Sequence, residues 1–337
     1  MQSFANNLSI RVSVSAKADQ EFDAAFAPGR DKGKNTYRYV LLRFPLLSFF
    51  MIRTMSVNHR ETKPSLAHAT TPTPDLFRID GRTVLITGGG GAVGLEAARA
   101  VLESGGDAIC KDRQEKPLEV PWRTVLAASK KYGTRAWYYQ CDVTNEENVR
   151  HVFKTSMEGI RFPFRGMVAC AGISGDGATI DFPIDKAKRI LEVNVTGSLI
   201  CAQAASREFQ QQGAPGSIVF IASMSGHISN KGLDTAAYNS SKSAVVQMAR
   251  SLAAEWGSRA GIPLIRVNTV SPGYIRTRMS EASLKDPEIE KKWMEDNMLM
   301  RLSEAHEYRG AIVFLLSDAS SFMTGSDIKV DGGHTAW

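Results

Sequence analysis

Between Thr83 and Val330, short runs of aliphatic and β-branched residues alternate with longer segments of helical periodicity. The strand-like runs occupy residues 83–87, 107–110, 135–141, 166–170, 217–222, 264–270 and 327–330. The helical segments occupy residues 92–104, 119–132, 145–158, 184–212, 235–258 and 304–316. Strands separated by helices of this length form right-handed βαβ units, in which a parallel sheet is covered on both faces. The sequence therefore predicts an α/β fold made of one doubly wound Rossmann domain.

Residues 1–74 differ from the rest of the chain, because they show no sustained periodicity and end in the linker-like stretch ATTPTPD. Their longest apolar run, residues 40–52, is interrupted by Arg43 and Pro45 and is too short to cross a bilayer. We expect residues 1–74 to be an N-terminal extension, either disordered or an artefact of a gene model whose true start is Met55. Residues 75–337 are expected to form the Rossmann domain.

Charge and cysteine content limit the partners and the compartment. The formal net charge is +6, but residues 1–74 carry +5 of it, so the main body has no nucleic-acid-binding patch. The four cysteines have neither metal-ligand spacing nor the density of a disulfide framework. We expect a cytoplasmic protein with no metal, no nucleic-acid partner and no membrane partner. The Ser-rich, acid-free residues 1–18 are a weaker indication of mitochondrial targeting.

The first predicted strand leads directly into the glycine-rich stretch TGGGGAVG, residues 87–94, where a helix begins. Glycines at such a turn let backbone N–H groups approach a pyrophosphate, and the helix N-terminus attracts its negative charge. The spacing of Gly89, Gly91 and Gly94 matches GxGxxG, and the strand–turn–helix context strengthens a match that is weak alone. The residues expected to contact the dinucleotide here are Gly88, Gly89, Gly91, Val93 and Gly94.

Acidic residues after the second and third strands suggest how the adenosine half is bound. Asp112 lies where a carboxylate accepts hydrogen bonds from ribose hydroxyls and repels a 2′-phosphate, which favours NAD(H). The neighbouring Lys111 and Arg113 keep NADP(H) open, because either could reach a phosphate. Asp142 and Val143 are placed to border the adenine, although Asp142 could equally cap the following helix.

The stretch from 217 to 242 carries the candidate chemistry. Tyr238 and Lys242 are spaced i, i+4 in a helical segment, so both project from one face. A lysine ammonium one turn away would lower the high pKa of a tyrosine and let the phenol exchange protons with a carbonyl oxygen. Ser223 could orient the same oxygen, and Asn194 could hold a water that relays protons from Lys242. Each residue alone is unremarkable, and only the nucleotide-binding turn upstream makes the set informative.

From about Leu76 to Trp337 the chain resembles the short-chain dehydrogenase/reductase family. The shared motifs, in order, are TGGGGAVG, Asp142-Val143, Ala171-Gly172, Asn194, Ser223, YNSSK (238–242), RVNTVSPGYIRT (266–277) and VDGG (330–333). The resemblance implies a catalytic tetrad of Asn194, Ser223, Tyr238 and Lys242. It implies that Lys242 binds the nicotinamide ribose and that Tyr238, Ala171, Gly172, Pro272, Gly273, Ile275 and Thr277 border the cofactor. A homo-oligomer, a dimer or a tetramer, is implied as well.

Two positions depart from the family pattern. Ala92 replaces a glycine of the phosphate-binding turn, where an extra methyl group could crowd a pyrophosphate. The usual NNAG reads ACAG at 169–172, so the hydrogen bonds of its structural asparagine are missing.

Within the family, the chain is most similar to fungal polyol dehydrogenases and ketose reductases, which implies a ketose/polyol pair as substrate and product. Substrate choice is expected in the loops 174–183 and 224–233, which includes His227, and in a Met-rich lid at 278–300. A reductase of a secondary-metabolite or acyl-chain ketone is the alternative enzyme. A non-catalytic nucleotide sensor is the alternative of another class, although it would not need the proton donor Tyr238.

Overall fold

The computed structural model describes residues 38–42, 50–54 and 69–337, which fall into two units, Met1–Asn58 and His59–Trp337. In the first unit β1 (Arg38–Leu42) pairs antiparallel with β2 (Phe50–Thr54), placing Val40 opposite Ile52. This pairing was not predicted. The rest of the expected extension, up to residue 68, lies outside the described residues, and so does its proposed start at Met55.

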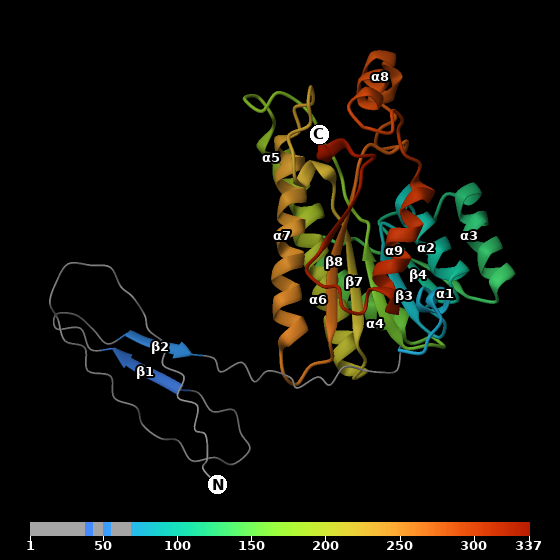
Figure 1. Cartoon of the computed structure of the whole chain (residues 1–337), viewed down its shortest axis with the longest axis vertical. Helices are drawn as coiled ribbons and strands as arrows, with labels where there is room; N and C mark the ends of the chain where they lie inside the picture. Colours follow the sequence, from blue (N-terminus) through green and yellow to red (C-terminus); the bar gives the residue numbers. More distant parts are fainter. Residues whose placement is uncertain (1–37, 43–49, 55–68) are drawn as a thin grey trace, which may run out of the picture. The chain divides into compact units, whose positions relative to one another are not determined.

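The second unit is built on a seven-stranded parallel sheet with the order β5-β4-β3-β6-β7-β8-β9 (Figure 1). Its strands are β3 (Thr83–Thr87), β4 (Asp107–Asp112), β5 (Ala136–Gln140), β6 (Phe164–Ala169), β7 (Gly216–Ile221), β8 (Ile265–Pro272) and β9 (Asp327–Val330). All seven strand predictions are confirmed. The strand order reverses between β3 and β6, and a crevice opens at the carboxyl ends of the strands at such a reversal.

Helices cover both faces of the sheet, as predicted. The α-helices of this unit are α1 (Thr73–Leu76), α2 (Ala92–Glu103), α3 (Glu119–Tyr132), α4 (Glu146–Met157), α5 (Ile184–Leu191), α6 (Ser198–Gln211), α7 (Ala236–Ser258), α8 (Pro287–Glu295) and α9 (Arg309–Leu316). Helices α2, α3 and α9 pack on one face, and α4, α6 and α7 pack on the other (Figure 1). Among the described residues, no helix has the length and apolar character needed to cross a membrane.

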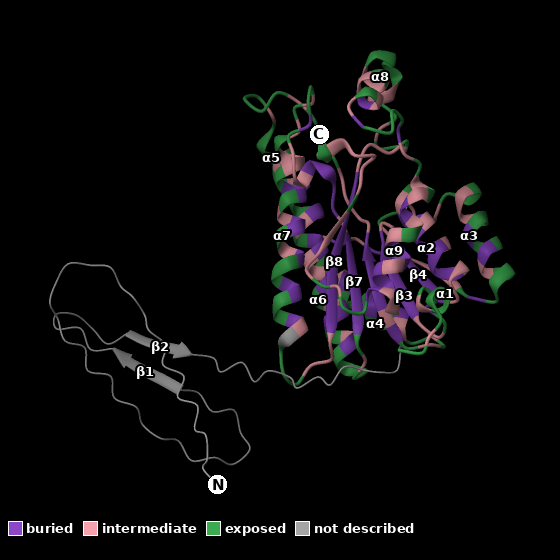
Figure 2. Cartoon of the chain, in the orientation of Figure 1, coloured by how far each residue is buried: buried purple, intermediate pink, exposed green. Residues whose placement is uncertain are grey.

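Strand β3 shows why this sequence needs two covering layers. All five of its residues are buried, and successive side chains point to opposite faces of a sheet. Val84 and Ile86 join the core under α2 and α9, whereas Leu85 joins the core under α4, α6 and α7. Figure 2 shows the buried strands enclosed between the two helical layers. A strand that is apolar at every position is stable only when both of its faces are covered.

The long helix predicted at 184–212 is interrupted in the structure. A six-residue π-helical segment, Glu192–Gly197, separates α5 from α6, so the backbone shifts register by about one residue within a continuous helical path. The helix predicted at 304–316 begins as a 3-10 turn, Ala305–Tyr308, which a capping box between Glu304 and Glu307 stabilises. Within the expected lid at 278–300, the structure forms the short helix α8.

Candidate active site

The turn between β3 and α2 is packed so tightly that several of its glycines have no room for a side chain. Gly88 has a φ of 63°, and a Cβ atom there would lie 2.6 Å from the backbone nitrogen of Ala171. A Cβ on Gly89 would lie 2.6 Å from the Cβ of Cys110, and one on Gly94 would lie 2.2 Å from the carbonyl oxygen of Gly88. The absence of side chains at these glycines therefore lets the turn pack directly against the ends of β4 and β6.

The helix N-terminus at this turn is suited to an anion. No side chain caps α2 at Gly91, and its first turn, which includes Val93, holds no acidic residue. The first N–H groups of a helix have no partner within the helix and, together with the helix dipole, attract a phosphate. Ala92 is exposed at the first helical position, so its methyl group does not fill the turn. The residues present therefore fit the pyrophosphate of a dinucleotide.

Asp112 is the last residue of β4, and its side chain is directed at the glycine turn. Its Oδ2 accepts a hydrogen bond from the backbone N–H of Gly90 at 3.0 Å, and its Oδ1 accepts one from that of Gln114 at 3.3 Å. These two hydrogen bonds fix the carboxylate beside the turn, whereas the side chain of a solvated loop residue would be free to move.

Lys111 does not lie where it could reach a cofactor phosphate, a contact that the sequence had left possible. The side chain is fully buried, with Nζ 3.7 Å from the centroid of the Phe153 ring under α4, and burial lowers its pKa to about 7. Because neighbouring side chains of a strand point to opposite faces, Lys111 is directed into the core. Its suggested contact with a cofactor phosphate is wrong for this arrangement, and of the two flanking cations only Arg113 is exposed.

Asp142 and Val143 follow β5 at the same edge of the sheet. The Oδ1 of Asp142 accepts hydrogen bonds from the backbone N–H and the hydroxyl of Thr144 at 2.9 and 2.8 Å. Asn145 itself caps α4, since its side chain accepts the N–H of Asn148 at 2.9 Å. The alternative that Asp142 caps this helix is therefore wrong. Val143 packs against the helical path of α5 and α6 at Gly197, where a Cβ atom would lie 2.8 Å from its Cγ2.

The structure brings Ser223, Tyr238 and Lys242 together. Ser223 follows β7, and the other two residues lie one turn apart at the start of α7. The Ser223 hydroxyl accepts the N–H of Ser225 at 3.1 Å and lies close enough to the Tyr238 phenol to affect its pKa, and the Lys242 Nζ lies 5.7 Å from the centroid of the Tyr238 ring. Ser223 and Lys242 are both only 7% exposed, whereas Tyr238 is half-buried, so its ring remains partly accessible.

The electrostatics of Tyr238 differ from the prediction. Burial raises the pKa of Tyr238, and only the neighbouring Ser223 hydroxyl acts in the opposite direction. The expected lowering by Lys242 is absent because the ammonium is turned to the backbone, donating to the Ile221 carbonyl at 2.9 Å. Burial also lowers the pKa of Lys242 to about 8. At neutral pH the phenol is protonated and beside a hydroxyl, which suits a proton donor.

Asn194 lies in the π-helical segment and is 1% exposed. Its amide oxygen accepts the N–H of Ile173 at 2.8 Å, and its amide nitrogen donates to the Ile173 carbonyl and the Ser241 hydroxyl, both at 2.9 Å. Gly172 lies between the Asn194 amide and the Lys242 ammonium group. A Cβ atom there would be 3.4 Å from the Asn194 Oδ1 and 3.5 Å from the Lys242 Nζ. The Asn194 side chain therefore holds the loop after β6 in place through hydrogen bonds to Ile173, contacts that its position in the sequence did not predict.

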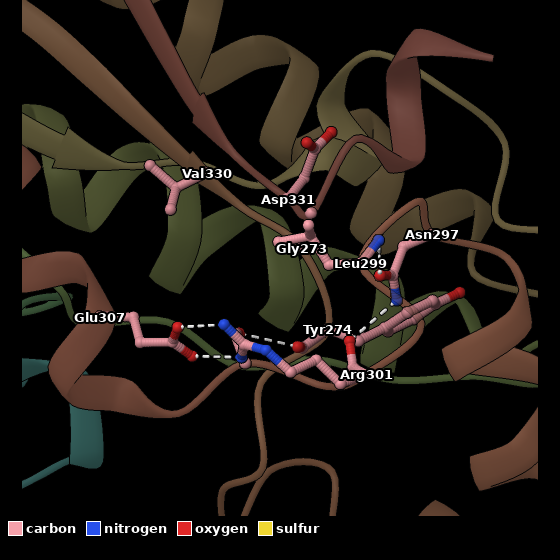
Figure 3. A pocket seen from close by; sticks show the side chains of 10 residues that line it. Gly273, Tyr274, Asn297, Leu299, Arg301, Glu307, Val330 and Asp331 are labelled. Atoms are coloured by element: carbon pink, nitrogen blue, oxygen red, sulfur yellow. Dashed lines mark hydrogen bonds and ion pairs between the residues drawn. The ribbon is translucent and has the colours of Figure 1, made fainter.

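The segment after β8 is fixed against the C-terminal part of the chain. Pro272 ends the strand, and a Cβ on Gly273 would lie 2.8 Å from the Cα of Asp331. Ile275 bridges to Ser303, and the N–H of Thr277 donates to Ser280 at 3.0 Å. Because β7 and β8 are neighbours, this segment lies at the same sheet edge as Ser223. A cavity of about 70 Å³ lies beside it and is lined in part by Gly273, Tyr274 and Asn297 (Figure 3).

Sequence analysis missed a cluster around Tyr274. The Tyr274 ring stacks on Trp293 of α8 with centroids 4.2 Å apart, and its hydroxyl accepts a hydrogen bond from Asn230 at 3.3 Å. These residues are too far apart in the sequence for any spacing to indicate their contact. His227, a candidate substrate contact, instead pairs its Nε2 with the Asp327 carboxylate at 2.9 Å. In the part of the chain that the structure describes, no group of His, Cys, Asp and Glu side chains is arranged to hold a metal.

Residues 90–335 match the family model described as enoyl-(acyl carrier protein) reductase. The chain is 48% identical over 279 residues to the short-chain dehydrogenase/reductase notP′ of Aspergillus versicolor, covering 83% of this chain and 96% of that protein. It is 38% identical to the sorbose reductase sou1 of Schizosaccharomyces pombe, over 77% of this chain and 98% of that protein.

Solved structures agree with these sequence relatives. An NADPH-dependent 3-quinuclidinone reductase from Rhodotorula rubra superposes with a TM-score of 0.73 at 32% identity, covering 82% of this chain and 99% of that chain. The family match covers most of the Rossmann unit, including the glycine turn from Gly90 onwards and the serine, tyrosine and lysine of the cluster. The chain belongs to the short-chain dehydrogenase/reductase family and is a nicotinamide-dependent oxidoreductase that acts on alcohol and carbonyl groups.

Proposed function

We propose that this enzyme interconverts a ketose and the corresponding polyol. The observation that carries the proposal is the grouping of Ser223 beside Tyr238, one helical turn from Lys242, at the edge of the sheet that also holds the glycine turn. The substrate class is supported by relatives named sorbose reductase, NADP-dependent mannitol dehydrogenase and D-arabinitol 2-dehydrogenase, which are 34–38% identical to this chain.

The proposed roles follow from the positions of the side chains. In the reductive direction, the neutral Tyr238 phenol donates its proton to the carbonyl oxygen, and the Ser223 hydroxyl holds that oxygen in place. Lys242, with a pKa of about 8, is mostly charged at neutral pH and would bind the nicotinamide ribose. Asn194 positions the loop at Gly172. A bound nicotinamide supplies the hydride in reduction and accepts it in oxidation.

The cofactor contacts are proposed at the same edge. The turn from Gly88 to Gly94 would hold the pyrophosphate, Asp142 and Val143 the adenine, and the segment from Pro272 to Thr277 the nicotinamide side. We propose that Asp112 favours NAD(H), because its fixed carboxylate would accept bonds from both ribose hydroxyls and repel a 2′-phosphate. Several relatives are named NADP-dependent, so this chain would differ from them at that contact.

An apolar ketone is the second candidate substrate, and the surface of the lid favours it. Met279, Met298, Leu299 and Met300 are each at least 45% exposed. Flexible methionine side chains adapt to apolar ligands of varied shape, as the carbon skeleton of a secondary metabolite or an acyl chain would require. Exposed methionines equally suit contact with another protein chain, so we rank this candidate second.

We also propose a homo-oligomer, a dimer or a tetramer, that associates through the face of α5 and α7. A cavity of about 250 Å³ on this face is lined by apolar side chains that include Phe182 and Leu191. Ile180 and Ile184 beside it are 92% and 68% exposed. Grouped apolar side chains of this kind are typical of subunit interfaces. The four unpaired cysteines support a reducing compartment such as the cytoplasm.

The substrate proposal is tested by following nicotinamide absorbance with the full-length enzyme. NADH and NADPH are each offered with neutral ketoses, apolar ketones and acyl-chain ketones. Oxidation with a ketose at a kcat/KM at least tenfold above that of any apolar ketone supports the proposal. A preference for apolar ketones would instead support the second candidate substrate. Binding of NADH without turnover of any ketone would favour the nucleotide sensor.

A further inference from the structure

The aromatic ring of Tyr274 joins three segments that are distant in the sequence. Tyr274 directly follows Gly273, and its ring stacks on Trp293 of α8 with an interplanar angle of 1°. The His334 ring meets it edge-on, with centroids 5.5 Å apart and an interplanar angle of 88°. The ring is therefore held between the segment after β8, the lid helix and the C-terminal turn, and the direction of its hydroxyl is fixed.

Polar groups converge on this hydroxyl. The amide nitrogen of Asn230, a residue that is 4% exposed, donates to it at 3.3 Å. The Asp296 Oδ1 lies 3.9 Å from the Nζ of Lys231, the residue after Asn230, and its charge contributes, after burial, to the raised pKa of Tyr274. Asn230 belongs to the loop that connects Ser223 to Tyr238. The cluster is therefore attached to the same short segment as the reacting groups.

Three atoms of the cluster have unused hydrogen-bonding capacity. The Oδ1 of Asn230, the Oδ2 of Asp296 and the Nδ1 of His334 are buried and have no hydrogen-bond partner within the described residues. The two oxygens are acceptors, and the imidazole nitrogen accepts in one of its tautomers. Leaving a buried acceptor unpaired costs free energy, so a partner that donates hydrogen bonds is expected there.

We propose that Asn230, Tyr274 and Asp296 form a subsite that binds the hydroxyl groups of the substrate chain beyond the reacting carbon. Each hydroxyl carries a donor that complements these acceptors, and a polyol presents several of them on successive carbons. The inference rests on the proposed function, because it assumes a polyhydroxylated substrate whose carbonyl is held by Ser223 and Tyr238. It adds the residues that would distinguish such a substrate from a plain ketone.

The charge of the subsite favours a neutral sugar over a sugar acid. Asp296 places a carboxylate at the subsite, and a substrate carboxylate there would be repelled. Lys231 lies 3.9 Å from the other Asp296 oxygen, but its side chain is 77% exposed, so water screens much of its charge. A neutral ketose is therefore expected to be reduced more efficiently than a keto acid of the same chain length.

The competing explanation is that the cluster only holds the lid helix closed. In that case, disrupting the cluster would lower kcat/KM equally for every substrate. Loss of a hydroxyl-binding subsite would instead lower kcat/KM only for hydroxylated substrates. The decisive variant is Tyr274→Phe, which removes the hydroxyl but keeps the ring that stacks on Trp293. Asp296→Asn and Asn230→Leu probe the two partners, and Tyr132→Phe makes the same chemical change on α3 as a matched control.

The experiment measures kcat and KM of the full-length enzyme with fructose or sorbose and with 2-hexanone. For Tyr274→Phe we expect kcat/KM for the ketose to fall about tenfold, mostly through KM, and at least fivefold more than for 2-hexanone. Equal losses of kcat/KM for both substrates, or no loss for either, would overturn the subsite proposal. If the unaltered enzyme reduces 2-hexanone but no ketose, the proposed function fails first and the subsite with it.

Discussion

The two ends of the active-site edge are built in opposite ways. The proposed cofactor end consists of a contiguous stretch, residues 87–94, in which Gly88, Gly89 and Gly94 are required because Cβ atoms would collide with backbone or with Cys110. The proposed substrate end is assembled from Asn230, Tyr274, Asp296 and His334, which meet only in the folded chain. One end is therefore constrained by the backbone and tolerates few changes. The other depends on side chains and can be altered with little effect on the fold.

The largest effect is expected at the boundary between the two ends. Tyr238→Phe removes the proposed proton donor, and we expect kcat to fall by roughly 10²–10⁴-fold, the range of general acid catalysis. Titration of the variant with NADH by fluorescence should give a dissociation constant within about threefold of the unaltered enzyme, because Lys242 is intact. Turnover that survives the change would remove Tyr238 from its proposed role.

Gly94→Ala tests the backbone constraint directly. The added methyl carbon would lie 2.2 Å from the Gly88 carbonyl oxygen, which cannot move without opening the turn. We expect a loss of roughly 3 kcal/mol in the free energy of unfolding, measured by urea denaturation, together with weaker cofactor binding. Gly310→Ala is the matched control, because a Cβ there meets nothing within 4 Å. Equal stability of the two variants would contradict the constraint.

Lys111→Met tests a core residue directly beneath the cofactor end. The pKa of Lys111 is lowered to about 7 by burial, so the folded state releases a proton that the unfolded state retains up to about pH 10. The unaltered protein should therefore gain stability from this group as the pH rises from about 7 towards 10. At pH 6 the variant should be more stable by roughly 2 kcal/mol, because no unpaired charge is buried.

This advantage should shrink between pH 7 and pH 9, where the native lysine becomes neutral. Urea denaturation at pH 6 and pH 9 measures both values. A variant that is less stable than the unaltered protein at pH 6 would mean that the ammonium has a stabilising role with Phe153.

Asp112→Ala is expected to have the smallest effect of the four. Removal of the carboxylate should raise the ratio of kcat/KM with NADPH to that with NADH by about tenfold, since one charge repulsion and one ribose contact are lost. Asp142→Ala is a useful comparison, because that side chain is proposed at the adenine rather than the ribose. An unchanged ratio would assign the cofactor preference to another residue.

The parts of the site that the sequence predicted share one property: each lies at a strand end or within one helical turn. The glycine turn and the pair of Tyr238 and Lys242 belong to this group, as does Asp112 at the end of β4. The sequence could not show that Lys242 donates to the Ile221 carbonyl, which explains why the expected effect on the pKa of Tyr238 was wrong. Nor could it place Asn194 in a π-helical segment, because periodicity predicts an uninterrupted helix there.

The sequence by itself determined the parallel sheet, both helical layers and the order of the motifs along its edge, because these follow from local periodicity and from the rule that βαβ units are right-handed. Tertiary structure alone decided which polar groups are buried together. Lys111 and Asp112 are neighbours in the chain, yet one enters the core and the other faces the glycine turn. Contacts such as that of Tyr274 with Asn230 depend on the packing of whole segments, and residue spacing carries no information about them.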